Sequence, residues 1–264
     1  MSFDEMTEST CKKQIESIFL SGKVADCEGC LHDLGSNIDQ KEGEFLFNLI
    51  RKHNYSKTLE VGCAMGISSL YICAALEGKE KASHTIIDPM QTTNWHSIGI
   101  TQLDKAGVEY YKLLEEPSEF ALPRLAESGE KYDFCFIDGW HTFDHTLIDF
   151  FYIDRMLEPG GVVAIDDITF SGIKKLMRYI VNYPNYKVIG NVPTENRRGL
   201  VGCLYDGIVA SFRPLSKLFP IKMRYRIFSD NIIRPDKKLG IDASMIALQK
   251  TASDTRRWDW YLDF

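Results

Sequence analysis

Three aspartates and one histidine stand where the chain could carry out chemistry. Asp138 directly follows one short apolar segment, Asp166 and Asp167 directly follow another, and His141 comes shortly after Asp138. If these segments are neighbouring parallel strands, the three carboxylates meet at one sheet edge and repel one another unless a cation lies between them. Carboxylate oxygens suit Mg²⁺ or a similar hard divalent cation. Histidine ordinarily titrates near pH ~6.5, so we expect a metal site with a proton acceptor beside it.

Two other interpretations of these residues stay open. His141 and His145 would lie on one face of a helix and could bind a transition metal there. Asp166 or Asp167 could instead cap the N-terminus of the helix expected over Ile173–Val181.

A second candidate site is the loop Glu60-Val-Gly62-Cys-Ala-Met-Gly66-Ile-Ser68. A dinucleotide-binding loop needs Gly-x-Gly-x-x-Gly, and here Ala64 occupies the middle glycine position. A Walker loop needs a lysine after its last glycine, and none follows Gly66. The loop therefore fits neither a dinucleotide-binding nor a Walker motif. The simplest alternative is that the glycines only permit a tight turn.

Two carboxylates near this loop indicate another kind of ligand. Glu60 precedes the loop and would repel a phosphate but attract a positive group. Asp88 ends the next apolar segment and could accept hydrogen bonds from two ribose hydroxyls. A cationic, ribose-containing cofactor without phosphate is S-adenosylmethionine.

Short β-rich segments alternate with helical segments from Lys57 onward, which is typical of βαβ units. This pattern predicts an α/β fold with a doubly wound, mostly parallel seven-stranded sheet. Strands are expected over Thr58–Val61, His84–Ile87, Val108–Leu114, Tyr132–Ile137 and Val162–Ile165, with further β-rich runs at Tyr186–Val192, Gly199–Tyr205 and Met245–Leu248. Helices are expected over Ile67–Leu76, Trp95–Ala106, Ser118–Glu127, Thr142–Leu157 and Ile173–Val181.

The remaining segments flank this pattern. Residues 1–56 form a mostly helical leader, residues 57–264 one domain, and residues 205–240 a basic insertion that could be a lid or a membrane-surface helix. Residues 205–238 hold eight Lys or Arg against three Asp, a net charge of +5, so the rest of the chain carries -11. The C-terminal Arg256–Phe264 holds four aromatic residues, and we expect it to dock on its own domain or on a second subunit of a homo-oligomer.

Composition narrows the functional classes. The formal net charge of -6 over 264 residues argues against general nucleic-acid binding. No run of about 18 apolar residues occurs, and the acidic N-terminus lacks the pattern of a signal peptide. We therefore expect a soluble, cytoplasmic protein without a stable membrane span.

Seven cysteines, an odd number, favour a reducing compartment over a disulfide framework. Cys27, Cys30 and His32 could be zinc ligands, but a structural zinc site usually shows two ligand pairs and only one is present.

Several motifs together resemble a known family. Glu42-Gly-Glu-Phe-Leu and the glycine loop resemble class I S-adenosylmethionine-dependent methyltransferases of the catechol and caffeoyl-CoA O-methyltransferase branch. Phe136-Ile-Asp138-Gly-Trp-His141 and Pro159-Gly-Gly161 through Asp167 resemble the metal-dependent natural-product and sugar O-methyltransferases. The resemblance covers roughly residues 40–182.

The resemblance implies roles for individual residues. The methionine part of the cofactor would lie on the loop, the ribose on Asp88, the adenine near Glu116 and Ser118, and the metal on Asp138, Asp166 and Asp167. The residues expected to contact the cofactor are Glu60, Gly62, Ala64, Gly66, Ser68, Asp88, Glu116, Ser118 and Asp138. His141 stands where the catechol branch has its lysine base, so we expect it to be the general base.

We therefore expect an O-methyltransferase that uses S-adenosylmethionine and a divalent cation such as Mg²⁺ to methylate a small catechol, sugar or natural-product diol. Alignment of the acceptor oxygen with the methyl group would supply up to ~7–11 kcal/mol of the barrier reduction. The alternatives are a metal-independent methyltransferase that relies on His141 alone, and a non-catalytic protein that binds the cofactor or a partner.

Overall fold

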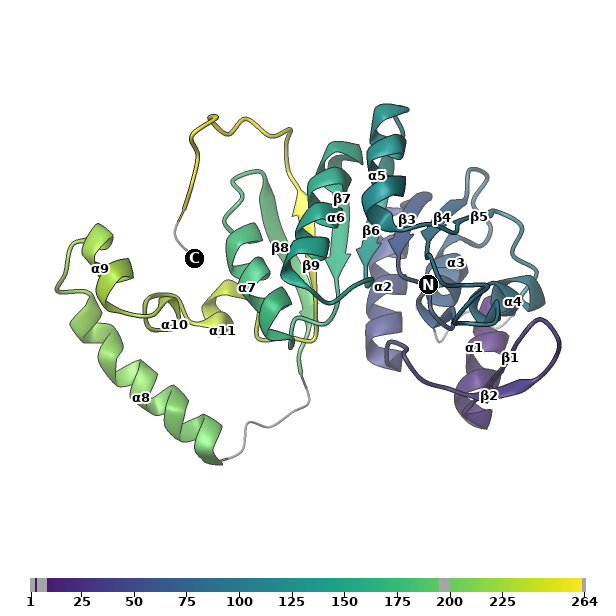
Figure 1. Ribbon diagram of the computed structural model, residues 1–264, viewed down its shortest axis with the longest axis horizontal. Helices are drawn as coiled ribbons and strands as arrows, with labels where there is room; N and C mark the ends of the chain where they lie inside the picture. Colours follow the sequence, from purple (N-terminus) through teal and green to yellow (C-terminus); the bar gives the residue numbers. More distant parts are fainter. Residues whose placement is uncertain (1–2, 4–8, 195–199, 263–264) are drawn as a thin grey trace.

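A seven-stranded sheet forms the centre of the molecule. The computed structural model describes residues 3, 9–194 and 200–262 (Figure 1). The strand order is β5-β4-β3-β6-β7-β9-β8; in this sheet β9 pairs antiparallel with β7 and β8, and the other neighbouring strands pair in parallel. The doubly wound, mostly parallel sheet is thereby confirmed. The strands are β3 (Lys57–Val61), β4 (Ser83–Ile87), β5 (Tyr111–Leu114), β6 (Tyr132–Ile137), β7 (Leu157–Ile165), β8 (Tyr186–Val192) and β9 (Met245–Lys250).

Helices cover both faces of the sheet, which explains why its central strands are apolar throughout. In β6, Phe134 and Phe136 pack toward the layer of α1 to α4, whereas Cys135 and Ile137 pack toward α5 to α7. The helices are α1 (Thr10–Ser21), α2 (Gln40–His53), α3 (Ile67–Leu76), α4 (Ile98–Lys105), α5 (Ser118–Glu127), α6 (Phe143–Met156) and α7 (Ser171–Ile180).

The segment before β3 is less helical than expected. Between α1 and α2 the chain forms a hairpin of β1 (Lys23–Ala25) and β2 (Leu31–Asp33). A capping box then starts α2, since Asp39 accepts from the Glu42 amide at 2.8 Å and Glu42 accepts from the Asp39 amide at 2.9 Å. Most of the acidic N-terminal segment, residues 1–2 and 4–8, lies outside the described residues.

One expected strand is wrong. The run at Gly199–Tyr205 is not β, because from Leu200 onward it belongs to α8 (Leu200–Ser216), and Gly199 lies outside the described residues. A short run of mainly apolar residues fits a strand or a buried helix equally well by periodicity. The strand expected over Val108–Leu114 is shorter in the structure, where β5 begins at Tyr111.

The basic segment forms an arm of helices beside the sheet (Figure 1). After α8 come α9 (Ile221–Ile227), α10 (Asp230–Ile233) and α11 (Asp236–Leu239). Buried Arg178 of α7 holds the base of this arm, because its guanidinium donates to Asp230, to Asp236 and to the carbonyl of Arg234. None of the helices in the described part of the chain is long and apolar enough to cross a membrane.

Candidate active site

The candidate site lies where the strand order reverses. From β3 the chain proceeds outward through β4 and β5, whereas β6 and β7 lie on the other side of β3, so the loops after β3 and β6 diverge and leave a crevice. Directly after the strand ends, before they diverge, the two loops are in contact: a Cβ on Gly62 would overlap the carbonyl oxygen of Asp138. Gly62 also has φ +88°, a conformation that glycine adopts without strain.

A cavity of about 420 Å³ opens at this crevice. That volume lies within the range of small-molecule sites, roughly 300–1,000 Å³. Most of the expected site residues line the cavity, namely Gly62, Ala64, Ser68, Asp88, Ser118, Asp138, His141, Asp166 and Asp167. Glu60, Gly66 and Glu116 are absent from the cavity wall.

Glu60, which we expected to bind the positive group of the cofactor, is absent from the residues that line the cavity. Its carboxylate is completely buried, accepts from the Ser69 hydroxyl and lies 3.1 Å from Nε2 of His84. Glu60 therefore joins β3, α3 and β4 beneath the loop. Alternation along a strand sends successive side chains to opposite faces, so its place at the strand end did not fix its direction.

Asp88 contacts the loop more extensively than predicted. One of its oxygens accepts from the amides of Cys63 at 3.0 Å and Ala64 at 2.8 Å and from Gln91 Nε2 at 3.0 Å, while the other accepts from the Met90 amide at 2.8 Å. Asp88 thus fastens the glycine loop to the end of β4, at the cavity wall.

Of the two residues expected beside the adenine, Glu116 and Ser118, only Ser118 lines the cavity. Glu116 pairs with Arg124 and lies off the cavity wall. Ser118 begins α5, lines the cavity and hydrogen-bonds the side chain of Asp149, a buried carboxyl of α6. Burial raises the pKa of Asp149 to about 6.

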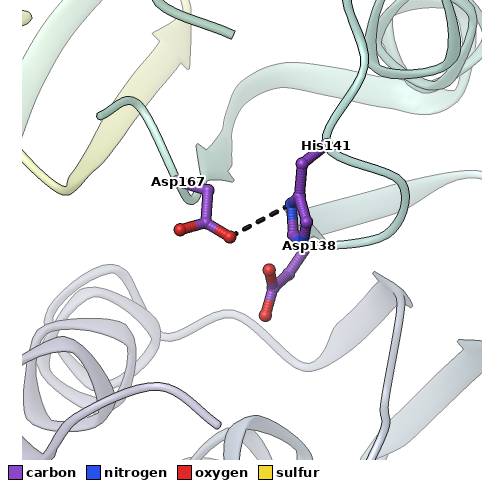
Figure 2. Close-up of side chains that lie close together, drawn as sticks. All are labelled: Asp138, His141 and Asp167. Carbon is purple, nitrogen blue, oxygen red and sulfur yellow. Dashed lines mark ion pairs between the residues drawn. The ribbon is translucent and has the colours of Figure 1, made fainter. Parts of the chain in front are cut away.

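Asp138, His141 and Asp167 lie close together (Figure 2), and all three line the cavity. One ligand atom from each lies within 4.8 Å of the other two. Nδ1 of His141 lies 3.0 Å from Oδ2 of Asp167, and the imidazole stacks on the ring of Phe170 with centroids 5.3 Å apart. Asp166 also lines the cavity but stands outside this group of three.

Burial and the repulsion between neighbouring carboxylates raise the pKa of the acidic residues at this site. Burial, followed by the charges of Asp166 and Asp167, raises the pKa of Asp138 well above its ordinary value. Burial and the charge of Glu42 do the same to the pKa of Asp166. Burial raises the pKa of Asp167, and His141 opposes that shift. A positive charge placed among these groups would relieve the repulsion.

Several residues of the cavity wall were missed from the sequence. Glu42 reaches the cavity from α2, and its motif had been noted without a role. Ser36–Ile38 come from the segment before α2, and Trp95 and Glu119 also line the wall. Trp140 is 57% exposed at the cavity.

The alternative metal sites find no support among the described residues. His145 lies 2.9 Å from the Thr142 hydroxyl and belongs to no group of potential ligands. His32 pairs with Asp26 at 2.8 Å, while Cys27 and Cys30 are exposed and join no such group. Phe170, without a side-chain cap, precedes α7, so neither Asp166 nor Asp167 is its N-cap.

Comparison with known proteins identifies the family. A family model described as a methyltransferase domain matches residues 59–168. A probable caffeoyl-CoA O-methyltransferase of Dictyostelium discoideum is 30% identical over 180 residues, which are 66% of this chain and 68% of that protein. The chain belongs to the caffeoyl-CoA O-methyltransferase-like family. It is therefore a class I, S-adenosylmethionine-dependent O-methyltransferase.

Other relatives of this O-methyltransferase agree. Catechol O-methyltransferase B of Danio rerio is 27% identical over 164 residues, 60% of each chain. An O-methyltransferase from Bacillus cereus, crystallised with S-adenosylhomocysteine (SAH), has a TM-score of 0.54 at 16% identity and covers 70% of this chain and 85% of its own. The O-methyltransferase of tomaymycin synthesis from Streptomyces achromogenes, crystallised with S-adenosylmethionine, has a TM-score of 0.53 at 19% identity, over 70% of this chain and 84% of its own. These two structures share its fold.

Proposed function

We propose that this O-methyltransferase methylates a hydroxyl of a small catechol-like or vicinal-diol acceptor with help from a divalent cation. The observation that carries the proposal is the grouping of Asp138, His141 and Asp167 on the wall of the cavity. The names of the relatives, caffeoyl-CoA and catechol O-methyltransferases, favour the same acceptor chemistry.

The cavity suits the cofactor of the family. Backbone at Gly62 and Ala64 approaches it closely, and Ser118 and Glu119 offer polar side chains at the start of α5. Bound there, S-adenosylmethionine supplies the methyl group. Because one oxygen of Asp88 already accepts from the amides of Cys63 and Ala64, we assign Asp88 mainly to shaping the loop that receives the methionine and ribose parts.

The acidic residues suit a divalent cation. Burial, followed by the charges of neighbouring carboxylates, raises the pKa of Asp138 and of Asp166 well above the ordinary value, and Asp167 completes the predicted set. When bound, the cation lowers the pKa of the acceptor hydroxyl and orients its oxygen. Glu42 adds negative charge behind Asp166.

His141 is the proposed base. If Nδ1 donates its hydrogen to Asp167, Nε2 presents a lone pair and can accept the proton of the acceptor hydroxyl. The stacked ring of Phe170 restricts the plane of the imidazole. Trp140 and Phe170, 57% and 50% exposed, offer apolar surfaces to a ring of the acceptor.

The test uses the full chain with S-adenosylmethionine and a panel of catechols, glycosides and polyketide diols. We expect turnover that rises with Mg²⁺ or Mn²⁺ and falls with EDTA, and binding of SAH by calorimetry. His141→Gln should lower kcat about 10²–10⁴-fold. The matched control His145→Gln, on a nearby histidine outside the group, should retain activity.

Other outcomes decide among the alternatives. Activity that survives EDTA and Asp166→Ala would replace metal assistance with the alternative of a metal-independent methyltransferase that relies on His141 alone. Binding of SAH without turnover of any acceptor would favour a non-catalytic, cofactor-binding role. Absence of SAH binding at high micromolar concentration would contradict the proposal.

A further inference from the structure

Residues 200–239, which we call the arm, expose apolar side chains along one face of a helix. Four apolar side chains of α8 are 45–68% exposed and recur every three or four residues, so they share one helix face. They are Leu204, Ile208, Phe212 and Leu215. Three more apolar residues, Leu218, Met223 and Ile227, are 46–78% exposed farther along the arm. Exposed apolar surface of this extent on one segment marks an interaction surface.

Positive charge lies on the same segment. Lys217, Arg226, Lys237 and Lys238 are exposed there. Two of the three aspartates between residues 205 and 238, Asp230 and Asp236, are turned inward to Arg178. The side chains of Asp230 and Asp236 are only 10% and 15% exposed, so these acids take little part in the outer surface of the arm, where the four cations are exposed.

Internal contacts keep the arm in one shape. Arg213 donates to the carbonyl of Ile232 at 3.3 Å and thereby ties α8 to α10. Arg224 donates to the carbonyls of Phe219 at 2.7 Å and Lys217 at 3.1 Å, which fixes the turn into α9. These contacts hold α8 in place relative to the other helices of the arm. The helix α8 itself lies away from the sheet (Figure 1).

We propose that this arm binds the surface of an anionic phospholipid bilayer. Such a surface offers negative headgroups to the cations and, just beneath them, an apolar boundary to the exposed Leu, Ile and Phe side chains. Two arms placed face to face would instead bring two charges of +5 together. The rest of the chain, at -11, is repelled by the same bilayer, so the arm makes the contact.

Flotation of the full chain with vesicles tests the proposal. We expect binding to phosphatidylcholine vesicles that contain 30% phosphatidylglycerol, weak binding to pure phosphatidylcholine, and release as NaCl rises from 0.1 to 0.5 M. The double variant Lys217→Gln with Arg226→Gln should bind about 20-fold more weakly. Ile208→Asp with Phe212→Asp should bind at least as poorly.

A matched control carries Leu31→Asp with Lys52→Gln, two exposed residues outside the arm, and should bind like the wild type. Thermal melts verify that each variant folds, and the salt and lipid dependence of the wild type remains a test if an arm variant does not. Absence of binding to anionic vesicles, or equal binding by the arm variants, overturns the proposal. So does a lipid-independent dimer that Ile208→Asp with Phe212→Asp disrupts. Because the readout is lipid binding, it is independent of methyl transfer.

Discussion

Nδ1 of His141 lies 3.0 Å from Oδ2 of Asp167, and the two residues come from different loops, after β6 and β7. Parallel pairing of β6 with β7 places Ile137 beside Ile165, so the loops that follow leave the sheet together. Asp167 itself has φ +56°, which is unusual for a residue with a side chain. The backbone turn there directs the carboxylate toward the imidazole (Figure 2).

Asp167→Asn tests whether this carboxylate orients the base. An asparagine oxygen can still serve a cation, but the charged acceptor for the imidazole is lost. We expect kcat to fall about 10–100-fold while the rise in Tm caused by Mn²⁺ is largely kept. Asp138→Asn, in contrast, should abolish that Mn²⁺ effect. Loss of the Mn²⁺ effect in Asp167→Asn with unchanged kcat would reverse the assignment.

Gly62→Ala and Gly66→Ala should lower stability by several kcal/mol and weaken SAH binding. Both glycines have positive φ, and a Cβ on Gly66 would come within 2.6 Å of the carbonyl oxygen of Gly99. Gly78→Ala is the control, because Gly78 has φ +77° in open space and should cost only about 1–2 kcal/mol. Chemical denaturation and calorimetry measure the two effects. Equal losses in all three variants would show that close packing contributes nothing.

Asp149 should make the free energy of unfolding depend on pH. Its pKa is about 6 in the folded protein and 3.8 when exposed, so between about pH 4 and 6 the folded state holds a proton that the unfolded state has released. Stability therefore falls as pH rises through this window, by up to about 3 kcal/mol. Asp149→Asn should be more stable than the wild type at pH 7.5 and equal to it near pH 4. Parallel Tm curves for the two proteins would contradict this explanation.

Glu60 should act on the stability of the loop rather than on the cofactor directly. Glu60→Gln leaves a buried carboxamide between Ser69 and His84, so we expect a lower Tm and less than about a threefold change in the Kd for SAH. Ser69→Ala removes one of the same hydrogen bonds and should behave alike. A Kd raised more than 30-fold with an unchanged Tm would restore Glu60 as a cofactor ligand.

Much of the architecture could be predicted because it depends on local pattern. Apolar runs of strand length, separated by helix-length segments, predicted the central strands, and for β6 and the helices α3 and α5 they predicted the bounds that the structure has. In contrast, β7 begins at Leu157 rather than at the expected Val162. Strand ends also predicted that Asp138, Asp166 and Asp167 would reach one cavity, since parallel strands deliver their carboxyl ends to the same edge.

Side-chain direction and long-range partners required the tertiary structure. Glu60 turns to His84 of the neighbouring strand, and Glu42 arrives from a helix outside the βαβ pattern. The imidazole of His141 pairs with Asp167, although the strand pattern did not distinguish Asp167 from Asp138 and Asp166 as its partner. Sequence by itself determined which residues end each strand, because hydrophobic periodicity is local. Only the packed sheet decided which of them meet, because the partner of a polar group is set by whatever neighbouring elements place within hydrogen-bond distance.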